Sequence, residues 1–217
     1  MWSFIRRRLD PVDRLGEMLF GLIMALGFTG AVRLGREEAD SRALFTGILG
    51  CNLAWAVVDG VMYALAEIFE RGRKARIVRL ARATASDDVA LDLIAGEVDA
   101  PLLELTTPEE RAQLHRWVLQ IVRRRPLPAA RLHRDDVLGG AAVACVIVLA
   151  TLPVIVPYLV VANPVLAVRL SNLVALALLF GLGMRWGSLV GAGPFRVGCG
   201  LTLVGLVLVL ITIVLGG

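Results

Sequence analysis

The stretch that decides the fold is CNLAWAVVDGVMYALAEIFE, residues 51–70. Its apolar run is long enough to cross a bilayer as a helix, yet it contains Asn52 and Asp59. In a helix these two residues lie two turns apart, so they share a face, which we expect to include Met62 and Tyr63. A carboxylate at membrane depth costs about 2.5–3.5 kcal/mol on insertion scales. A partner group, a bound ion or a water-filled path must therefore offset the cost of Asp59.

The composition indicates an integral membrane protein. Of the 217 residues, 57% are hydrophobic, and the mean hydropathy is +0.74. The apolar residues gather in several runs of about twenty, which soluble domains do not show. The sequence contains no nucleophile elbow, P-loop or HExxH motif, so we do not expect an enzyme.

Hydropathy predicts an all-α polytopic membrane protein with five transmembrane helices in a two-plus-three arrangement. A cytosolic helical insert separates the second helix from the third. The expected domains are a basic interfacial leader at 1–14, transmembrane helices 1 and 2 at 15–70, the insert at 71–136 and transmembrane helices 3 to 5 at 137–217. The spans themselves are expected at about 15–32, 43–67, 137–161, 165–184 and 195–215.

Basic residues cluster at 6–14 and at 71–82, and each cluster adjoins an apolar span. By the positive-inside rule both clusters lie in the cytoplasm, where they meet anionic lipid headgroups. This explanation is preferred to nucleic-acid binding, for which the sequence carries no further signal. We therefore expect a multi-pass protein of the inner (cell) membrane, with its N-terminus and insert in the cytoplasm and its C-terminus outside.

Capping residues mark three expected helix starts. Asp13 is a candidate N-cap for a helix that begins near Arg14. Ser86 precedes two acids, as at the start of a helix. The sequence Thr-Pro-Glu-Glu at 107–110 fits a capping box with proline at the first helical position. The helix that follows is expected to carry four apolar residues on one side: Leu114, Trp117, Val118 and Ile121.

Several stretches are similar to the vacuolar iron transporter family. LGEMLFGLIMALGFTGA at 15–31 resembles the family's first span, and LATLPVIVPYLV at 149–160 resembles the paired prolines of its third span. Met62 followed by Glu67 looks like the Met and Glu at the cytosolic mouth of the family's second span. This sequence differs in placing an Asp-Gly pair, Asp59-Gly60, in the second span and in lacking the Glu-x-x-Glu runs of the family's cytosolic domain.

The resemblance implies a transporter of ferrous and manganous ions that works against protons. It also implies a dimer whose first spans line a shared pathway. Glu17 would take the place of the family's metal-carrying aspartate. No resident cofactor is expected, and the expected partners are the lipid bilayer, a divalent metal ion, protons and a second copy of the chain.

The residues themselves predict a cation or proton site around Asp59, near the middle of the membrane. Asn52 on the same helix, Glu17 on the neighbouring helix or groups from a second copy would complete it. A thioether ligand would favour a transition metal over Mg²⁺ or Ca²⁺. The candidate metal ligands are Glu17, Asp59, Asn52, Met24, Met62 and Glu67. The alternative is a packing role, in which a protonated Asp59 bonds Asn52 or a tyrosine.

The insert holds weaker candidates for a divalent cation. They are Asp88, Asp92, Glu97, Glu109, Glu110 and His115. Helix capping already explains most of these acids, and neither histidine has metal-ligand spacing to another His or Cys.

Two functions follow from these patterns. The first is a homodimeric, proton-coupled exporter of Fe²⁺ or Mn²⁺, because a carboxylate must lose its proton before it ligates metal. The second is a non-transporting membrane adaptor whose cytosolic helices dock a partner protein.

Overall fold

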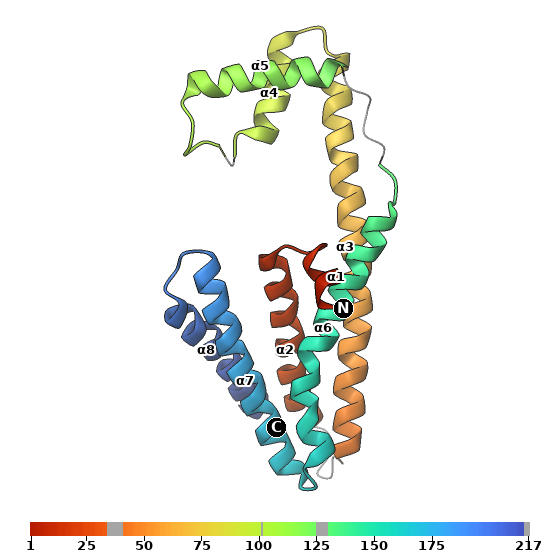
Figure 1. Cartoon of the computed structure of the whole chain (residues 1–217), viewed down its shortest axis with the longest axis vertical. Helices are drawn as coiled ribbons and strands as arrows, with labels where there is room; N and C mark the ends of the chain where they lie inside the picture. Colours follow the sequence, from red (N-terminus) through yellow and green to blue (C-terminus); the bar gives the residue numbers. More distant parts are fainter. Residues whose placement is uncertain (34–40, 101, 125–129, 215–217) are drawn as a thin grey trace. The chain divides into compact units, whose positions relative to one another are not determined.

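The structure is a computed structural model that describes residues 1–33, 41–100, 102–124 and 130–214. All regular secondary structure within these ranges is helical (Figure 1). The helices are α1 (Trp2–Arg6), α2 (Pro11–Arg33), α3 (Ser41–Ala83), α4 (Asp87–Val98), α5 (Pro108–Arg124), α6 (Arg134–Val160), α7 (Pro164–Leu189) and α8 (Pro194–Val214).

Four helical segments among the described residues are long and apolar enough to cross a membrane. They are Leu44–Ala83, Arg134–Val160, Pro164–Leu189 and Pro194–Ile211. The prediction of a helical membrane protein is confirmed at this level. The first predicted span, 15–32, falls in α2, and residues 34–40 of the predicted turn at 33–42 lie outside the described residues. The fifth crossing therefore stays a prediction.

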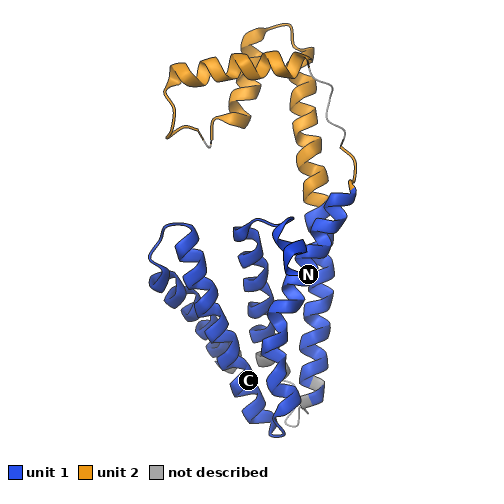
Figure 2. Cartoon of the chain, viewed as in Figure 1, with its two compact units in different colours: residues 1–64, 134–217 blue, residues 65–133 orange. Residues whose placement is uncertain are grey.

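The chain divides into two compact units (Figure 2). Unit 1 combines residues 1–64 with 134–217, and unit 2 is 65–133. The predicted insert, 71–136, overlaps unit 2 over residues 71–133. Helix α3 contributes its first part to unit 1 and its second part to unit 2.

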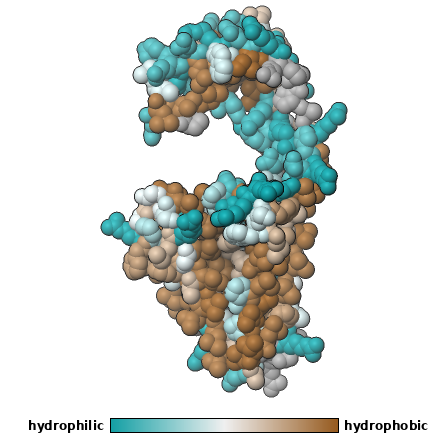
Figure 3. Space-filling model, in the orientation of Figure 1, coloured by the Kyte–Doolittle hydropathy of each residue, from teal (hydrophilic) through white to brown (hydrophobic). Residues whose placement is uncertain are grey.

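Unit 1 is a helix bundle in which α2 packs against α6, α7 and α8, and α7 packs against α8. Its main core gathers buried side chains such as Leu22, Leu26 and Leu179. Large apolar side chains also cover its outer surface (Figure 3). A soluble protein would bury most of these groups, whereas lipid tails cover them at no cost.

Helix α2 begins one turn earlier than expected, and Asp10 caps it instead of Asp13. Asp10 Oδ1 accepts hydrogen bonds from the backbone N–H groups of Val12, at 2.7 Å, and of Asp13, at 2.9 Å. Pro11 is the first helical residue. Proline suits this position because its fixed φ is helical and its missing N–H has no partner there. The Asp10-Pro11 pair is therefore the sequence signal for the start of α2.

Unit 2 contains α4, α5 and the second part of α3, with a small core of Ala81, Ala90, Ile94 and Leu119. The capping box at the start of α5 is confirmed. The backbone N–H of Thr107 donates to Glu110 Oε2 at 2.8 Å, and the N–H of Glu110 donates to Thr107 Oγ1 at 3.3 Å.

The predicted apolar face of α5 is wrong in part. Trp117 is 60% exposed and Ile121 is 38% exposed, while Leu119 is buried. Val118 and Val122 pack with Leu119 against the core. The buried face of α5 is therefore centred on Leu119 with Val118 and Val122, and Trp117 lies outside this core.

Candidate functional site

Helix α6 fixes the depth of Asp59 in the bundle. Gly60 of α3 lies against Gly140 of α6, and a Cβ atom on Gly60 would be 2.7 Å from the Gly140 carbonyl oxygen. Gly140 is six residues after the start of α6 at Arg134. Asp59 of α3 therefore lies level with the first third of α6. Its expected position near the middle of the membrane stays a prediction.

Helix α2 brings Glu17 to the same level. Gly21 lies against α6 at Ile147, where a Cβ atom would be 3.1 Å from the Ile147 carbonyl oxygen. Glu17 is one turn before Gly21, about 6 Å along the helix. Since α2 and α6 run in the same direction (Figure 1), Glu17 lies level with Val143 of α6.

The two carboxylates interact electrostatically. Asp59 on α3 and Asp13 on α2 are the charged groups whose fields act on Glu17. Glu17 Oε2 is buried and has no hydrogen-bond partner among the described residues. Asp59 is partly buried beside the Trp55 indole. Burial raises the pKa of Asp13, and the neighbouring Asp10 carboxylate adds to this effect. The carboxyl groups of Asp13 and Asp59 therefore both lie within electrostatic range of Glu17.

Helix α1 covers this end of the bundle. Ile5 and Leu9 are buried in a cluster with Ala56 of α3 and Val143 of α6, and Met18 of α2 packs against the same cluster. Two neighbouring arginines, Arg8 after α1 and Arg14 in α2, have contacts of their own. Arg8 Nη2 lies 3.7 Å from Asp135 Oδ1, and its guanidinium stacks over Phe4. Arg14 Nη1 donates to the Leu9 carbonyl.

Asn52 does not join the carboxylates. It is 1% exposed, and its Nδ2 donates to the Ile48 carbonyl at 3.1 Å. The Thr151 hydroxyl shares its proton between Asn52 Oδ1, at 3.1 Å, and the Ile147 carbonyl oxygen, at 2.9 Å. Thr151 is eleven residues beyond Gly140, about 16 Å along α6. Asn52 therefore links α3 to α6 deeper in the bundle.

The remaining predicted ligands are dispersed. Met62 is 57% exposed, although it was expected on the face of Asp59, whereas Tyr63 packs against Gly139 of α6. Met24 lies half-buried two turns beyond Glu17 on α2. Glu67 belongs to unit 2, where its Oε2 pairs with Arg71 Nη1 at 3.5 Å.

The acids of the insert have separate roles. Asp88, Asp92 and Glu109 are exposed. Glu97 accepts two hydrogen bonds of 2.6 Å from Arg73. Glu110 belongs to the capping box of α5. His115 Nε2 contacts Asp99 Oδ1 at 2.5 Å. Among the residues that the structure describes, no three His, Cys, Asp or Glu side chains form a group that could hold a metal ion.

Two polar residues of this region were missed in the sequence. Thr151 could have been found from the sequence, because a buried polar residue such as Asn52 needs a hydrogen-bond partner at the same level of the bundle. Asp136, near the start of α6, is only 5% exposed. The sequence placed it at the end of the polar insert, 71–136, and gave it no role of its own.

Comparison with protein-family models gives no match, and comparison with curated proteins gives no significant match. The chemistry of the site therefore rests on its geometry. Two carboxylates from different helices, one with a buried oxygen for which no described residue serves as a donor, suit the reversible binding of a proton or a cation.

Proposed function

We propose that the protein is a secondary transporter of a divalent transition metal, Fe²⁺ or Mn²⁺, and that Glu17 and Asp59 carry the ion and the proton in turn. The observation that supports this most is the buried Oε2 of Glu17, which has no hydrogen-bond partner in the described part of the chain and lies within electrostatic range of Asp59. If Glu17 served only in helix packing, we would expect a hydrogen-bond donor beside its Oε2 atom.

The coupling to protons follows from electrostatics. Two carboxylates in an apolar bundle repel each other, so a proton or a cation must neutralise part of their charge. A carboxylate binds a metal only after it loses its proton. Metal and protons therefore exchange at Glu17 and Asp59, as an exporter driven by a proton gradient requires.

The ligand set favours a site completed by a second copy. Oxygen ligands such as carboxylates and water suit Mn²⁺, which prefers an octahedral set and so takes more than two ligands. One chain supplies Glu17 and Asp59, and a homodimer would double this set. The resemblance of residues 15–31 and 149–160 to vacuolar iron transporters supports the same proposal.

The proposed orientation follows from charge. The N-terminus and residues 71–136 lie in the cytoplasm, α2 is the first of five crossings, and the C-terminus is outside, in the inner membrane. In this orientation α1 covers the cytoplasmic side of Glu17, and its displacement opens the route to the carboxylates.

A membrane adaptor is the second candidate. The exposed indole of Trp117 and the neighbouring Ile121 on α5 support it, because large exposed apolar groups outside a bilayer favour a docking surface. In that case Glu17 and Asp59 take part only in helix packing.

Thermal unfolding of the detergent-solubilised protein separates the two functions. A metal that binds the folded state at a hundred times its Kd stabilises it by about 2.7 kcal/mol. We expect Fe²⁺ or Mn²⁺ to raise the Tm of the wild type, but not that of Glu17→Gln or Asp59→Asn. Asp92→Asn, an exposed acid of unit 2, is the matched control and should keep the shift. No shift with Fe²⁺, Mn²⁺, Co²⁺ or Zn²⁺ would favour the adaptor.

A further inference from the structure

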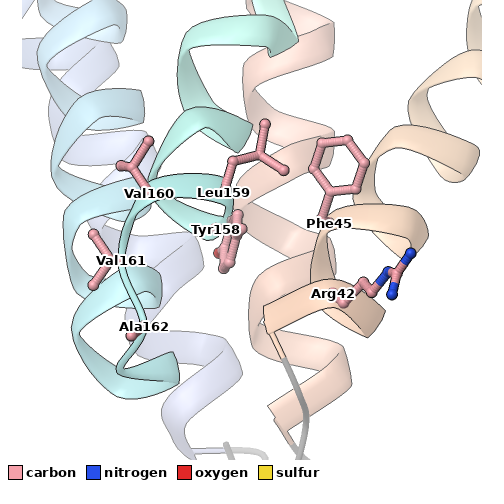
Figure 4. Close-up of a pocket in the computed structure, with 7 residues that line it drawn as sticks. All are labelled: Arg42, Phe45, Tyr158, Leu159, Val160, Val161 and Ala162. Atoms are coloured by element: carbon pink, nitrogen blue, oxygen red, sulfur yellow. The ribbon is translucent and has the colours of Figure 1, made fainter.

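The pocket at the far end of α6 is not organised around a ligand. It has a volume of about 500 Å³ and is lined by Arg42 and Phe45 of α3 and by residues 158–162 (Figure 4). The guanidinium of Arg42 extends away from Tyr158, so these two polar side chains do not converge on one point. The exposed surface of α5 in unit 2 has a more specific chemistry.

Helix α5 carries two large apolar side chains on its outer surface. Trp117 is 60% exposed and Ile121 is 38% exposed, and they share a face because they are four residues apart. Leu114, which is half-buried, continues this face by one turn. The core of unit 2 is built around Leu119 instead, so the indole of Trp117 is free to contact another molecule.

Arginines accompany this apolar face. Residues 111–134 contain seven arginines and no Asp or Glu. Two of the arginines are engaged inside unit 2: Arg111 donates to a backbone carbonyl of the preceding loop at 2.7 Å, and Arg123 pairs with an acid of α4 at 2.5 Å. The guanidinium groups of Arg116 and Arg124 are exposed and make no ion pair or hydrogen bond with other described residues.

Trp117, Ile121, Arg116 and Arg124 form what we call the α5 patch. The acids of α5 lie in its first turn, about 10 Å before Trp117 along the helix, so the charge of the patch is positive only. Arginine side chains are long enough to reach a polar layer while the helix face beside them lies against apolar groups. Tryptophan, isoleucine and arginine on one surface are typical of helices that lie in the interface of an anionic bilayer.

The chain itself ties the α5 patch to a bilayer. Ten residues after the end of α5 at Arg124, the chain enters α6 at Arg134, and α6 is long and apolar enough to cross a membrane. A link of ten residues spans at most about 35 Å. Binding of a tethered patch is intramolecular, so a few contacts are enough to hold it. Basic residues directly beside a membrane-spanning helix are also typical of segments that bind anionic lipids.

We propose that the α5 patch binds the surface of a bilayer that contains anionic phospholipids. The indole of Trp117 and the side chain of Ile121 lie among the glycerol groups and the first carbons of the acyl chains. The guanidinium groups of Arg116 and Arg124 donate charge-assisted hydrogen bonds to lipid phosphates. Lipid then covers the face that the adaptor function would need for a partner protein.

Quenching of tryptophan fluorescence by lipids with brominated acyl chains tests the proposal on the full-length protein. The contribution of Trp117 is the emission of the wild type minus that of Trp117→Phe. In nanodiscs with equal amounts of phosphatidylcholine and phosphatidylglycerol, we expect bromination to lower this contribution about twofold. In phosphatidylcholine alone, or at high salt, the loss should be much smaller, because the attraction between arginine and anionic lipid is absent or screened.

Two matched controls separate the patch from general effects. Ala112→Trp in the Trp117→Phe background moves the indole to another exposed position of α5, about 140° around the helix, and its emission should not be quenched. Arg116→Gln combined with Arg124→Gln should reduce the quenching of Trp117 to the level found in phosphatidylcholine. Arg169→Gln combined with Arg196→Gln removes the same charge from exposed positions of unit 1 and should leave the quenching unchanged.

Each contrary result has a definite meaning. Emission of Trp117 that brominated lipids do not change in either membrane would overturn the proposal and leave the face open to a partner protein. Equal quenching with and without phosphatidylglycerol, or in the variant without Arg116 and Arg124, would show that the arginines do not select anionic lipid, and the proposal would again be wrong.

Discussion

Gly60 of α3 and Gly140 of α6 meet backbone to backbone, and this contact sets the depth of Asp59 in the bundle. A side chain at either position would push the two helices apart. The close approach aligns Asp59 with Glu17 of α2 at the level of residues 140–143 of α6. A two-residue contact between helices thus decides whether the carboxylates lie together.

Gly140→Ala should destabilise the protein. The added Cβ atom overlaps the Gly60 carbonyl, and overpacking of this kind costs about 1–3 kcal/mol. A cost of 1 kcal/mol lowers the Tm of a chain of this size by about 2–4 °C. Gly200→Ala in α8 is the control, because its Cβ atom meets no other atom within 4 Å. An unchanged Tm in Gly140→Ala would contradict the contact.

Asp10→Ala should destabilise α2 by about 1 kcal/mol, while Asp13→Ala should have a smaller effect. The backbone N–H of Asp13 lowers the pKa of Asp10, so this stabilisation is complete above the ordinary pKa of 3.8 and is lost as the pH falls below it. Thermal unfolding at pH 7 and near pH 3 measures both effects. A larger loss in Asp13→Ala would reverse the assignment of the cap.

The Arg73 network should make unit 2 sensitive to acid. Hydrogen bonds from Arg73 hold the pKa of Glu70 at about 2, below its ordinary value of 4.5. The contribution of Glu70 is therefore complete above pH 4.5 and is lost as the pH falls toward 2. Hydrogen exchange of α4, corrected for intrinsic rates, should accelerate over this range, and Glu70→Gln should flatten the profile. Glu104→Gln, an exposed acid, should follow the wild type. A Glu70→Gln profile as steep as that of the wild type would contradict the prediction.

Ile5→Ala should loosen α1. Ile5 is 0% exposed, and truncation of such a residue costs about 2–5 kcal/mol when the whole side chain is packed. If α1 covers Glu17, a water-soluble carbodiimide should modify Glu17 faster in this variant, as measured by peptide mass spectrometry. Val12→Ala, which alters an exposed side chain, is the control. Equal modification rates would show that α1 does not limit access.

The helical membrane class could be read from hydropathy, because runs of twenty apolar residues leave few alternatives. The level of Asp59 along α6 could not. Its neighbours in sequence place it near the middle of an apolar run, but they do not show which glycine of α6 meets Gly60. The start of α2 was missed because Asp13 was considered without the Asp10-Pro11 pair.

The candidate site was predicted only in part. Glu17 and Asp59 come to one level, as carboxylates on neighbouring helices can, but Asn52 pairs with Thr151 and Met62 faces outward. Periodicity shows which residues share a face of one helix. It does not show which neighbouring helix that face meets, and so it could not separate the packing role of Asn52 from the role of Asp59.

Metal flux in proteoliposomes tests the central claim most directly. The wild type, Asp59→Asn and the control Asp92→Asn are reconstituted at equal density, and uptake of Fe²⁺ or Mn²⁺ is followed with an internal metal-sensitive dye under a proton gradient. We expect flux in the wild type and the control, and none in Asp59→Asn that still elutes as a folded protein. Flux in Asp59→Asn equal to that of the wild type would contradict it.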